Sequence, residues 1–405
     1  MKHLLKPAVL AFLWPNDSRS ESNPNLYAWG NNTSGQLGLG SEISKAFPCV
    51  VEDLKREHVS KVFSSGQCSS SVAINPTGEV FTWGNGLDNI LGHNTGEANV
   101  ITPTKLNLEN SFTKVAVGGG HMIGLTKDGK LMSWGLDDCG QCGHEIIKQI
   151  VNPRDFRPQL LRGKSPGPVK GDLDGVKIID VACGKYFSVA LSEEGYVYTW
   201  GAGREYALGH GNRDSYKTPK RVGGLDGIKI TQIACGRNFV IARDNEGAVY
   251  AWGSNDYGQL GLGLIEKFKA QPQKLRLLKD VVDISCGDFH VLAVTSQGEV
   301  FSWGSGGDGQ LGHGNNSSQA TPTVINNLPK IAHVTCGGGH SGFITQDFRL
   351  FMCGRGIDGQ LGRQGKIESI ASNRNIPLQV EHFSKSRVLQ VAAGMHHSLA
   401  LVIDN

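Results

Sequence analysis

The sequence is short of the residues that would place it in several protein classes. Cysteine occurs 9 times in 405 residues, which is too few for a disulfide scaffold, so we expect reduced thiols and an intracellular compartment. Neither sign of charge is in excess, since 40 basic residues face 37 acidic ones, whereas a nucleic-acid-binding domain is expected to be strongly basic. No apolar run reaches the roughly 18 to 20 residues of a membrane span.

Glycine, in contrast, is abundant. Its 55 copies in 405 residues make up about 14% of the chain, roughly twice the usual share. They follow no Gly-X-Y period and lie in no low-complexity tract, which excludes collagen and a disordered linker. Glycine spread in this way through a chain with 39% apolar residues predicts many tight turns between short strands.

Two sequence patterns recur seven times and define a repeat of about 50 residues. The first is Trp-Gly, with Cys353-Gly354 in the seventh place, and successive copies are 54, 51, 66, 52, 51 and 50 residues apart. The second, called the marker here, is a small residue, Gly, two variable residues and usually His, as in Cys286 to His290. The marker glycines are Gly66, Gly118, Gly184, Gly236, Gly287, Gly337 and Gly394.

Each repeat has the sequence pattern of a small antiparallel sheet. Between Ile178 and Trp200, apolar runs are separated by turn signals such as Glu193-Glu194-Gly195, and residues 196–200 alternate as a half-buried strand does. One such sheet is too small to fold alone, but seven arranged around an axis bury their faces against one another. The sequence therefore predicts an all-β fold, a seven-bladed β-propeller.

The order of the two patterns predicts how the ring closes. Trp29-Gly30 has no marker before it, and the last marker, at Gly394, has no Trp-Gly after it. Half a repeat thus opens the sequence and the complementary half closes it. We therefore expect one blade to be shared between the N- and C-terminal strands, with Leu26 to Gly30 paired with Ser398 to Val402.

Two segments fall outside the repeat. Residues 1–23 form an N-terminal tail that has no acid before Asp17 and carries Lys2, Lys6 and an apolar run at 8–14. It fits a loosely docked tail or a mitochondrial presequence, so a mitochondrial location stands beside a cytoplasmic or nuclear one. Residues 24–405 are the expected propeller, in which the 66-residue spacing indicates an insertion at about 145–173, rich in Arg, Lys and Pro.

The repeats resemble a known family. The run Tyr-Ala-Trp-Gly-Ser-Asn-Asp-Tyr-Gly-Gln-Leu-Gly-Leu-Gly at residues 250–263 recurs in related form at 27–40 and 301–314. Together with the markers it is similar to the regulator of chromosome condensation family, over about residues 24–405. The resemblance implies seven blades and a shared terminal blade. It does not imply one activity, because the family includes a GTPase exchange factor, an ultraviolet-B photoreceptor, mitochondrial and ciliary proteins, and domains of ubiquitin ligases.

Two comparisons within the family narrow the choice. The photoreceptor places tryptophan directly after the marker glycine, but none of the seven positions here is tryptophan, so photoreception is not expected. They are Gln67, Gly119, Lys185, Arg237, Asp288, Gly338 and Met395. The resemblance to the exchange factor implies acidic residues in the early marker loops. Those loops are neutral here, at residues 67–68 and 119–120, and the first carboxylate of a marker loop is Asp288.

The sequence contains no recognisable catalytic constellation. Cys139 and Cys142 form a C-x-x-C without the second pair of a zinc site. The G-x-G-x-x-G of residues 304–309 follows a repeat strand and opens no helix, unlike a dinucleotide site. We therefore expect no cofactor and no metal. The repeated histidines are interpreted as hydrogen-bonding ties between strands rather than as bases or ligands; they are His121, His290, His340 and His397.

The two variable residues of each marker remain as candidate binding residues. Charge and aromatic character concentrate in the three middle loops, and these residue types are enriched at binding hot spots. The candidate partner-binding residues are Lys185, Tyr186, Arg237, Asn238, Asp288 and Phe289. We expect a protein-interaction scaffold without an active site, alone or as a structural subunit of a larger assembly. The alternative is a guanine-nucleotide exchange factor whose partner is a small GTPase.

Overall fold

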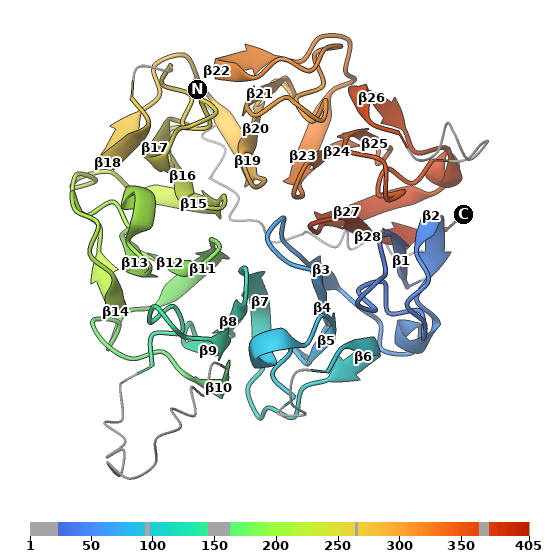
Figure 1. Cartoon of the computed structure of the whole chain (residues 1–405), viewed down its shortest axis with the longest axis horizontal. Helices are drawn as coiled ribbons and strands as arrows, with labels where there is room; N and C mark the ends of the chain where they lie inside the picture. The colour runs from blue at the N-terminus through green and yellow to red at the C-terminus, as the bar shows by residue number, and fades with distance from the viewer. Residues whose placement is uncertain (1–22, 94–97, 145–162, 264–265, 364–371, 405) are drawn as a thin grey trace, which may run out of the picture.

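The chain forms a ring of seven four-stranded antiparallel sheets around one axis (Figure 1), as the repeat predicted. The computed structural model describes residues 23–93, 98–144, 163–263, 266–363 and 372–404. Blades 1 to 6 follow one another along the chain, and each contains four consecutive strands. Their first strands surround the axis and their fourth strands lie outermost. Blade 7 combines strands from both terminal regions in the order β2-β1-β28-β27.

Blade 1 contains β3 (Lys61–Phe63), β4 (Ser70–Ile74), β5 (Val80–Gly84) and β6 (Val100–Lys105). Blade 2 contains β7 (Phe112–Val117), β8 (His121–Thr126), β9 (Leu131–Leu136) and β10 (Gly163–Pro168). Blade 3 contains β11 (Ile178–Cys183), β12 (Phe187–Ser192), β13 (Val197–Gly201) and β14 (Tyr216–Arg221). Blade 4 contains β15 (Ile230–Cys235), β16 (Phe239–Asp244), β17 (Val249–Ser254) and β18 (Phe268–Lys274). Blade 5 contains β19 (Val281–Cys286), β20 (His290–Thr295), β21 (Val300–Gly304) and β22 (Gln319–Val324). Blade 6 contains β23 (Ile331–Cys336), β24 (His340–Thr345), β25 (Leu350–Gly354) and β26 (Arg374–Gln379). Blade 7 contains β1 (Asn25–Gly30), β2 (Lys45–Val50), β27 (Arg387–Ala393) and β28 (His397–Ile403). In the part of the chain that the structure describes, four short 3-10 turns accompany the strands: η1 (Glu52–Leu54), η2 (Leu87–Asn89), η3 (Arg204–Tyr206) and η4 (Glu381–Phe383).

The Trp-Gly pattern has a packing role at the seams between blades. The indole of Trp303 is fully buried, and its Nε1 donates a hydrogen bond to the carbonyl of Gln259 in the preceding blade, at 2.9 Å. In blade 6, Cys353 takes the place of tryptophan, and its Sγ donates to the equivalent carbonyl of Gln310 at 3.6 Å. Cys353 thus keeps a donor at its seam, as five of the six tryptophans do, whereas the Nε1 of Trp200 has no partner among the described residues.

Blade 7 confirms the expected closure. Strand β1 pairs with β28 in antiparallel register, with Leu26 opposite Leu401 and Gly30 opposite His397. The carboxylate of Asp404 adds a clasp, since it accepts hydrogen bonds from Asn25 Nδ2 at 2.9 Å and from the Tyr27 hydroxyl at 2.8 Å. The ring is thus closed by a strand from each end of the chain.

The two segments expected outside the repeat fall largely outside the described residues. These are residues 1–22 of the tail and 145–162 of the insertion. Residues 163–168 form β10, which pairs with β9 as the outer strand of blade 2, so this part of the expected insertion belongs to the blade. All nine cysteines are free thiols. In the described residues, no helix is long and apolar enough to cross a membrane.

Candidate functional site

The marker glycine is required because the side chain three residues later folds back over it. A Cβ placed on Gly118 would lie 2.4 Å from Cε1 of His121, far inside van der Waals contact. The same holds in blades 3 and 4, where Phe187 and Phe239 replace the histidine and their rings would each lie 1.9 Å from a Cβ on Gly184 and Gly236. The turn is therefore tight, and its two variable residues form the tip of a short loop.

The marker histidines tie neighbouring blades together, as the sequence indicated. The Nε2 atom of each histidine lies within hydrogen-bonding distance of the Oγ of a serine, which stands at the start of the second strand of the next blade. The pairs are His121–Ser188 (2.9 Å), His290–Ser341 (3.0 Å), His340–Ser398 (3.0 Å) and His397–Ser71 (2.9 Å). Burial lowers the pKa of all four imidazoles, to about 3 for His121, His340 and His397 and about 4 for His290. They are neutral ties within the core.

The marker loops are joined to one another at one end of the propeller, called the marker end here. In three successive marker loops, a backbone N–H donates a hydrogen bond to a backbone carbonyl of the next loop: Gly119 to Lys185 (3.1 Å), Lys185 to Arg237 (3.0 Å) and Arg237 to Asp288 (3.2 Å). On the other side of the ring, Gly338 donates to Gly394 at 3.1 Å. Loops that are far apart in sequence are therefore held side by side, and their tips form one surface.

The structure brings most of the predicted binding residues together on blades 3 to 5. The Lys185 ammonium lies 5.0 Å from the centre of the Tyr186 ring, and the Arg237 guanidinium lies 5.6 Å from that of Phe289. Both distances are typical of cation–π contacts. Arg237 also lies 3.9 Å from the carboxylate of Asp288. These side chains form two adjacent cation–aromatic pairs at the marker end.

Asp288 supports this surface from within the fold, whereas Asn238 is half-buried like Arg237. Asp288 is 8% exposed, and burial raises its pKa to about 6, although Arg237, a hydrogen bond with Gln67 and Lys185 act to lower it. Asn238 accepts a hydrogen bond from the Ser254 N–H through its backbone carbonyl, at 2.9 Å. Asp288 therefore fixes Arg237 from below, and the carboxylate itself is largely hidden from a partner.

Family models cover nearly the whole propeller. A model described as RCC1-like domain matches residues 105–405. A second, described as Regulator of chromosome condensation (RCC1) repeat, matches residues 25–72 and 77–125.

The chain belongs to the RCC1 family of β-propellers.

Individual relatives are similar over about three quarters of this RCC1 chain. It is 33% identical over 308 residues to the human E3 ubiquitin-protein ligase HERC2, of which it spans 6%. It is 32% identical over 314 residues to the Arabidopsis thaliana RCC1 domain-containing protein RUG3, mitochondrial, and 31% identical over 303 residues to the Arabidopsis thaliana ultraviolet-B receptor UVR8. These matches cover 75% and 74% of the chain and 66% and 65% of the two relatives.

Solved structures share the fold of this RCC1 propeller. Human WBSCR16 superposes with a TM-score of 0.79 at 23% identity, covering 94% of the present chain and 99% of that one. Prp20p from Saccharomyces cerevisiae, a protein described with binding properties to Gsp1p and histones, gives 0.80 at 22% identity and covers 95% and 92%. At these identities the likeness concerns the fold.

The sequence did not predict that the marker loop of blade 1, in this RCC1 propeller, reaches the middle marker loops. The marker of blade 1 is one residue longer, because Ser70 stands in the register of His121 but follows its glycine by four residues instead of three. A Cβ on Gly66 would lie 2.9 Å from the carbonyl carbon of Gly337 in blade 6. The longer loop thus reaches across blade 7, which brings Gln67 to Asp288. The missing histidine at position 69 is the signal that could have indicated it.

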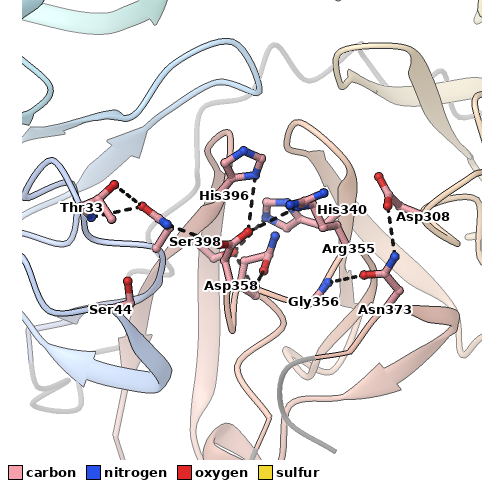
Figure 2. A network of polar contacts seen from close by, with 12 residues as sticks. Thr33, Ser44, Asp308, His340, Arg355, Gly356, Asp358, Asn373, His396 and Ser398 are labelled. Atoms are coloured by element: carbon pink, nitrogen blue, oxygen red, sulfur yellow. Dashed lines mark hydrogen bonds and ion pairs between the residues drawn. The ribbon is translucent and has the colours of Figure 1, made fainter. Parts of the chain in front are cut away.

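The sequence analysis also overlooked two further carboxylates at the marker end (Figure 2). Asp358 accepts a hydrogen bond from Asn31 Nδ2 at 3.4 Å, and it lies 3.4 Å from Arg355 Nε and 3.9 Å from His396 Nδ1. Asp308 accepts one from Asn373 Nδ2 at 3.1 Å. Asp308 follows Trp303-Gly304, and Asp358 follows Cys353-Gly354, at the same spacing. This equal spacing could have predicted that the two acids lie in equivalent loops. Within the described residues, no three His, Cys, Asp or Glu side chains form a group that could hold a metal ion.

Proposed function

We propose that this chain is a protein-interaction scaffold whose marker end docks a partner protein without chemistry of its own. The observation that carries the proposal is the pair of cation–aromatic contacts on adjacent loops, Lys185 with Tyr186 and Arg237 with Phe289. Backbone hydrogen bonds hold the two loops together. Arginine and aromatic side chains that are fixed before binding cost less ordering entropy on association, which suits them to be binding anchors.

The charge of this surface favours an acidic partner. Asp288 is buried beneath Arg237, while the cationic heads of Lys185 and Arg237 are partly exposed. The segment 145–162, with four basic residues and two acids, has the same sign. The same basic surface would bind a single docked protein or another subunit of a larger assembly.

Nucleotide exchange on a small GTPase is the second candidate function. Its support is the fold shared with Prp20p, which binds Gsp1p, and the carboxylate of Asp288 in a marker loop. The buried position of Asp288 and the basic groups around it weigh against exchange, because Lys185 and Arg237 would meet a GTPase's basic nucleotide pocket with the wrong sign. We therefore place exchange second.

Charge reversal tests the docking surface. Lys185→Glu combined with Arg237→Glu should weaken binding of the partner recovered with the wild-type protein by about tenfold or more, since each lost desolvated contact costs about 1 kcal/mol. Isothermal titration gives the affinities, and thermal melting checks that the fold is kept. The matched control is Lys177→Glu with Lys229→Glu, because both exposed lysines lie just before β11 and β15, at the opposite end of the same blades. An equal loss of affinity in both double variants, or no loss in Lys185→Glu with Arg237→Glu, would refute the proposal that these residues form the docking surface.

We also propose a mitochondrial location. Its support is the acid-poor, basic start of the sequence together with the similarity to a relative named as mitochondrial. Residues 1–22 fused to a fluorescent protein should carry it into mitochondria, as imaging against a mitochondrial dye would reveal. A diffuse or nuclear signal would favour the cytoplasmic or nuclear alternative.

A further inference from the structure

The loop after each third strand normally needs glycine at one position. Five blades carry Gly there, five residues after the Gly of Trp-Gly or Cys-Gly, with φ between 76° and 83°. A Cβ at these positions would come within 2.5 to 2.8 Å of a Cα atom in the outer strand of the next blade. The loop thus lies directly on that strand. The five glycines are Gly35, Gly140, Gly258, Gly309 and Gly359.

Blades 1 and 3 break this rule with Asn89 and Tyr206. Both keep the left-handed backbone, at φ 56° and 59°. Asparagine tolerates this conformation, whereas it is a genuine outlier for a bulky residue such as tyrosine. Glu205, the residue before Tyr206, is also left-handed at φ 55°. Strain of this kind persists only where other contacts hold it, and it points to a role for the side chain.

The ring of Tyr206 is held in a stacked cluster at the surface. It stacks on Phe268 of β18, with ring centres 4.4 Å apart and planes 25° from parallel. The guanidinium of Arg213 lies 4.8 Å from the centre of the Tyr206 ring and 5.3 Å from that of Phe268. Both rings are half-buried and Arg213 is exposed. We call Tyr206, Phe268 and Arg213 the Tyr206 platform.

The platform lies at the outer rim of the marker end. Gly201, which ends β13, pairs with Phe187 of the marker, so the loop that contains η3 leaves the blade at that end. This loop packs against β18, which is the outermost strand of blade 4 (Figure 1). The platform therefore covers the seam between blades 3 and 4, on the same sector as Lys185 and Arg237 but farther from the axis.

The charge of Arg213 is available to a ligand. Among the residues that the structure describes, Arg213 forms no ion pair, and its contacts are with the two aromatic rings. Stacking uses the face of a guanidinium and leaves its edge N–H donors open, in the fork that binds a carboxylate with two hydrogen bonds. Phosphate-tracking surfaces need many basic side chains together. Around the platform bases and acids are mixed instead, since Arg204 and Lys267 are accompanied by Glu205 and Asp214 and Lys269 is paired with Glu266 at 2.8 Å. A carboxylate of a protein fits the platform better than a nucleic acid.

We propose that the Tyr206 platform is a docking site for an acidic protein segment. The segment places a carboxylate on the edge of Arg213 and an apolar side chain against the rings of Tyr206 and Phe268. This inference rests on the proposed function, since it assumes that the propeller binds proteins, but it adds a site that is distinct from the marker loops. The strained backbone of blade 3 projects the ring that the segment contacts.

Tyr206→Gly separates this role from a structural one. Glycine relieves the left-handed strain, so the variant should melt at the wild-type temperature or above it, while the platform is lost. Asn89→Gly is the matched control, because it makes the same change at the same position of blade 1. A merely structural role for Tyr206 predicts a lower melting temperature in the first variant, caused by the lost stacking, and unchanged binding.

The test uses a displayed library of random 12-residue peptides, selected on the full-length protein and counter-selected on Tyr206→Gly. We expect peptides rich in Asp and Glu with one or two aromatic or aliphatic residues. Their affinity, measured by fluorescence anisotropy, should fall about tenfold or more in Tyr206→Gly and Arg213→Glu and be unchanged in Asn89→Gly. Failure to enrich any peptide, enrichment of basic peptides, or competition by single-stranded oligonucleotides would overturn the proposal.

Two variants distinguish failure of the platform from failure of the proposed function. Peptides that bind Tyr206→Gly normally but lose affinity for the protein with Lys185→Glu and Arg237→Glu would overturn the platform and support the marker loops. Peptides that lose affinity only in Tyr206→Gly and Arg213→Glu would establish the platform, whatever the marker loops bind.

Discussion

Deletion of residues 394–405 should yield a protein that aggregates, or that melts far below the full chain. The deletion removes β28, which lies between β1 and β27 in blade 7. Their edges would then be exposed, and unpaired edges template aggregation. It also removes His397 and Ser398, and with them the ties to Ser71 in blade 1 and to His340 in blade 6. Both seams of the closing blade are lost at once.

Size-exclusion chromatography and thermal melting measure this effect. Removal of residues 404–405 alone is the control, because it leaves β28 in place and, among the described residues, takes away the hydrogen bonds of Asp404 to Asn25, Tyr27 and Ser386. That control should elute as the full chain does and lose only a few degrees. If the longer deletion behaved like the shorter one, blade 7 would not close the ring.

Acid should destabilise the propeller from about pH 6.5 downward, and the opposing effect of Asp288, whose pKa burial raises to about 6, is outweighed by four buried histidines. Burial lowers the pKa of His121, His290, His340 and His397 to about 3 or 4, whereas the unfolded chain binds these protons near pH 6.5. Below that pH the unfolded state takes up more protons than the folded one, so the free energy of unfolding falls as the pH falls. Each histidine contributes a slope of about 1.4 kcal/mol per pH unit, until the pH reaches its folded pKa.

The chain offers a control for the acid effect. At the seams between blades 3 and 4 and between 4 and 5, Phe187 packs with Val240 and Phe239 with Val291 in the places of histidine and serine. His121→Phe with Ser188→Val converts the seam between blades 2 and 3 to this apolar type. Denaturant unfolding between pH 7 and pH 5 should give a smaller loss of stability in the double variant than in wild type. Equal losses would mean that the buried histidines do not cause the acid sensitivity.

Sequence alone predicted the features that the repeat imposes. One Trp-Gly or Cys-Gly and one marker per blade predict seven sheets and the shared blade 7, because each pattern recurs at the equivalent place of every blade. The repeated histidines could be interpreted as ties for the same reason. Features peculiar to one blade were not predictable in this way. The contact of Gln67 with Asp288 arises because blade 1 has a marker one residue longer than the others.

The sequence predicted that the marker loops meet at one end of the ring, but not how their side chains pack. The two variable marker residues do meet at one end of the ring, and Arg237, Asp288 and Phe289 do lie together. Their burial could not be read from sequence, and Asp288, expected as part of the binding surface, is almost wholly covered. The grouping of Asp358 with His396 and Arg355 depends on the contact between blades 6 and 7, which a linear pattern does not reveal. Tyr206 stood out only once its backbone conformation was known.

Release of a labelled guanine nucleotide from a panel of small GTPases tests the central claim, that the marker end holds a partner without acting on a nucleotide. The full-length protein is added to each GTPase in turn, and nucleotide dissociation is followed by fluorescence. Because Lys185 and Arg237 face outward while Asp288 is buried, dissociation should stay at the intrinsic rate for every GTPase in the panel. Acceleration of any one of them by about a hundredfold or more, which corresponds to about 2.7 kcal/mol of barrier lowering, would contradict the scaffold and establish an exchange factor.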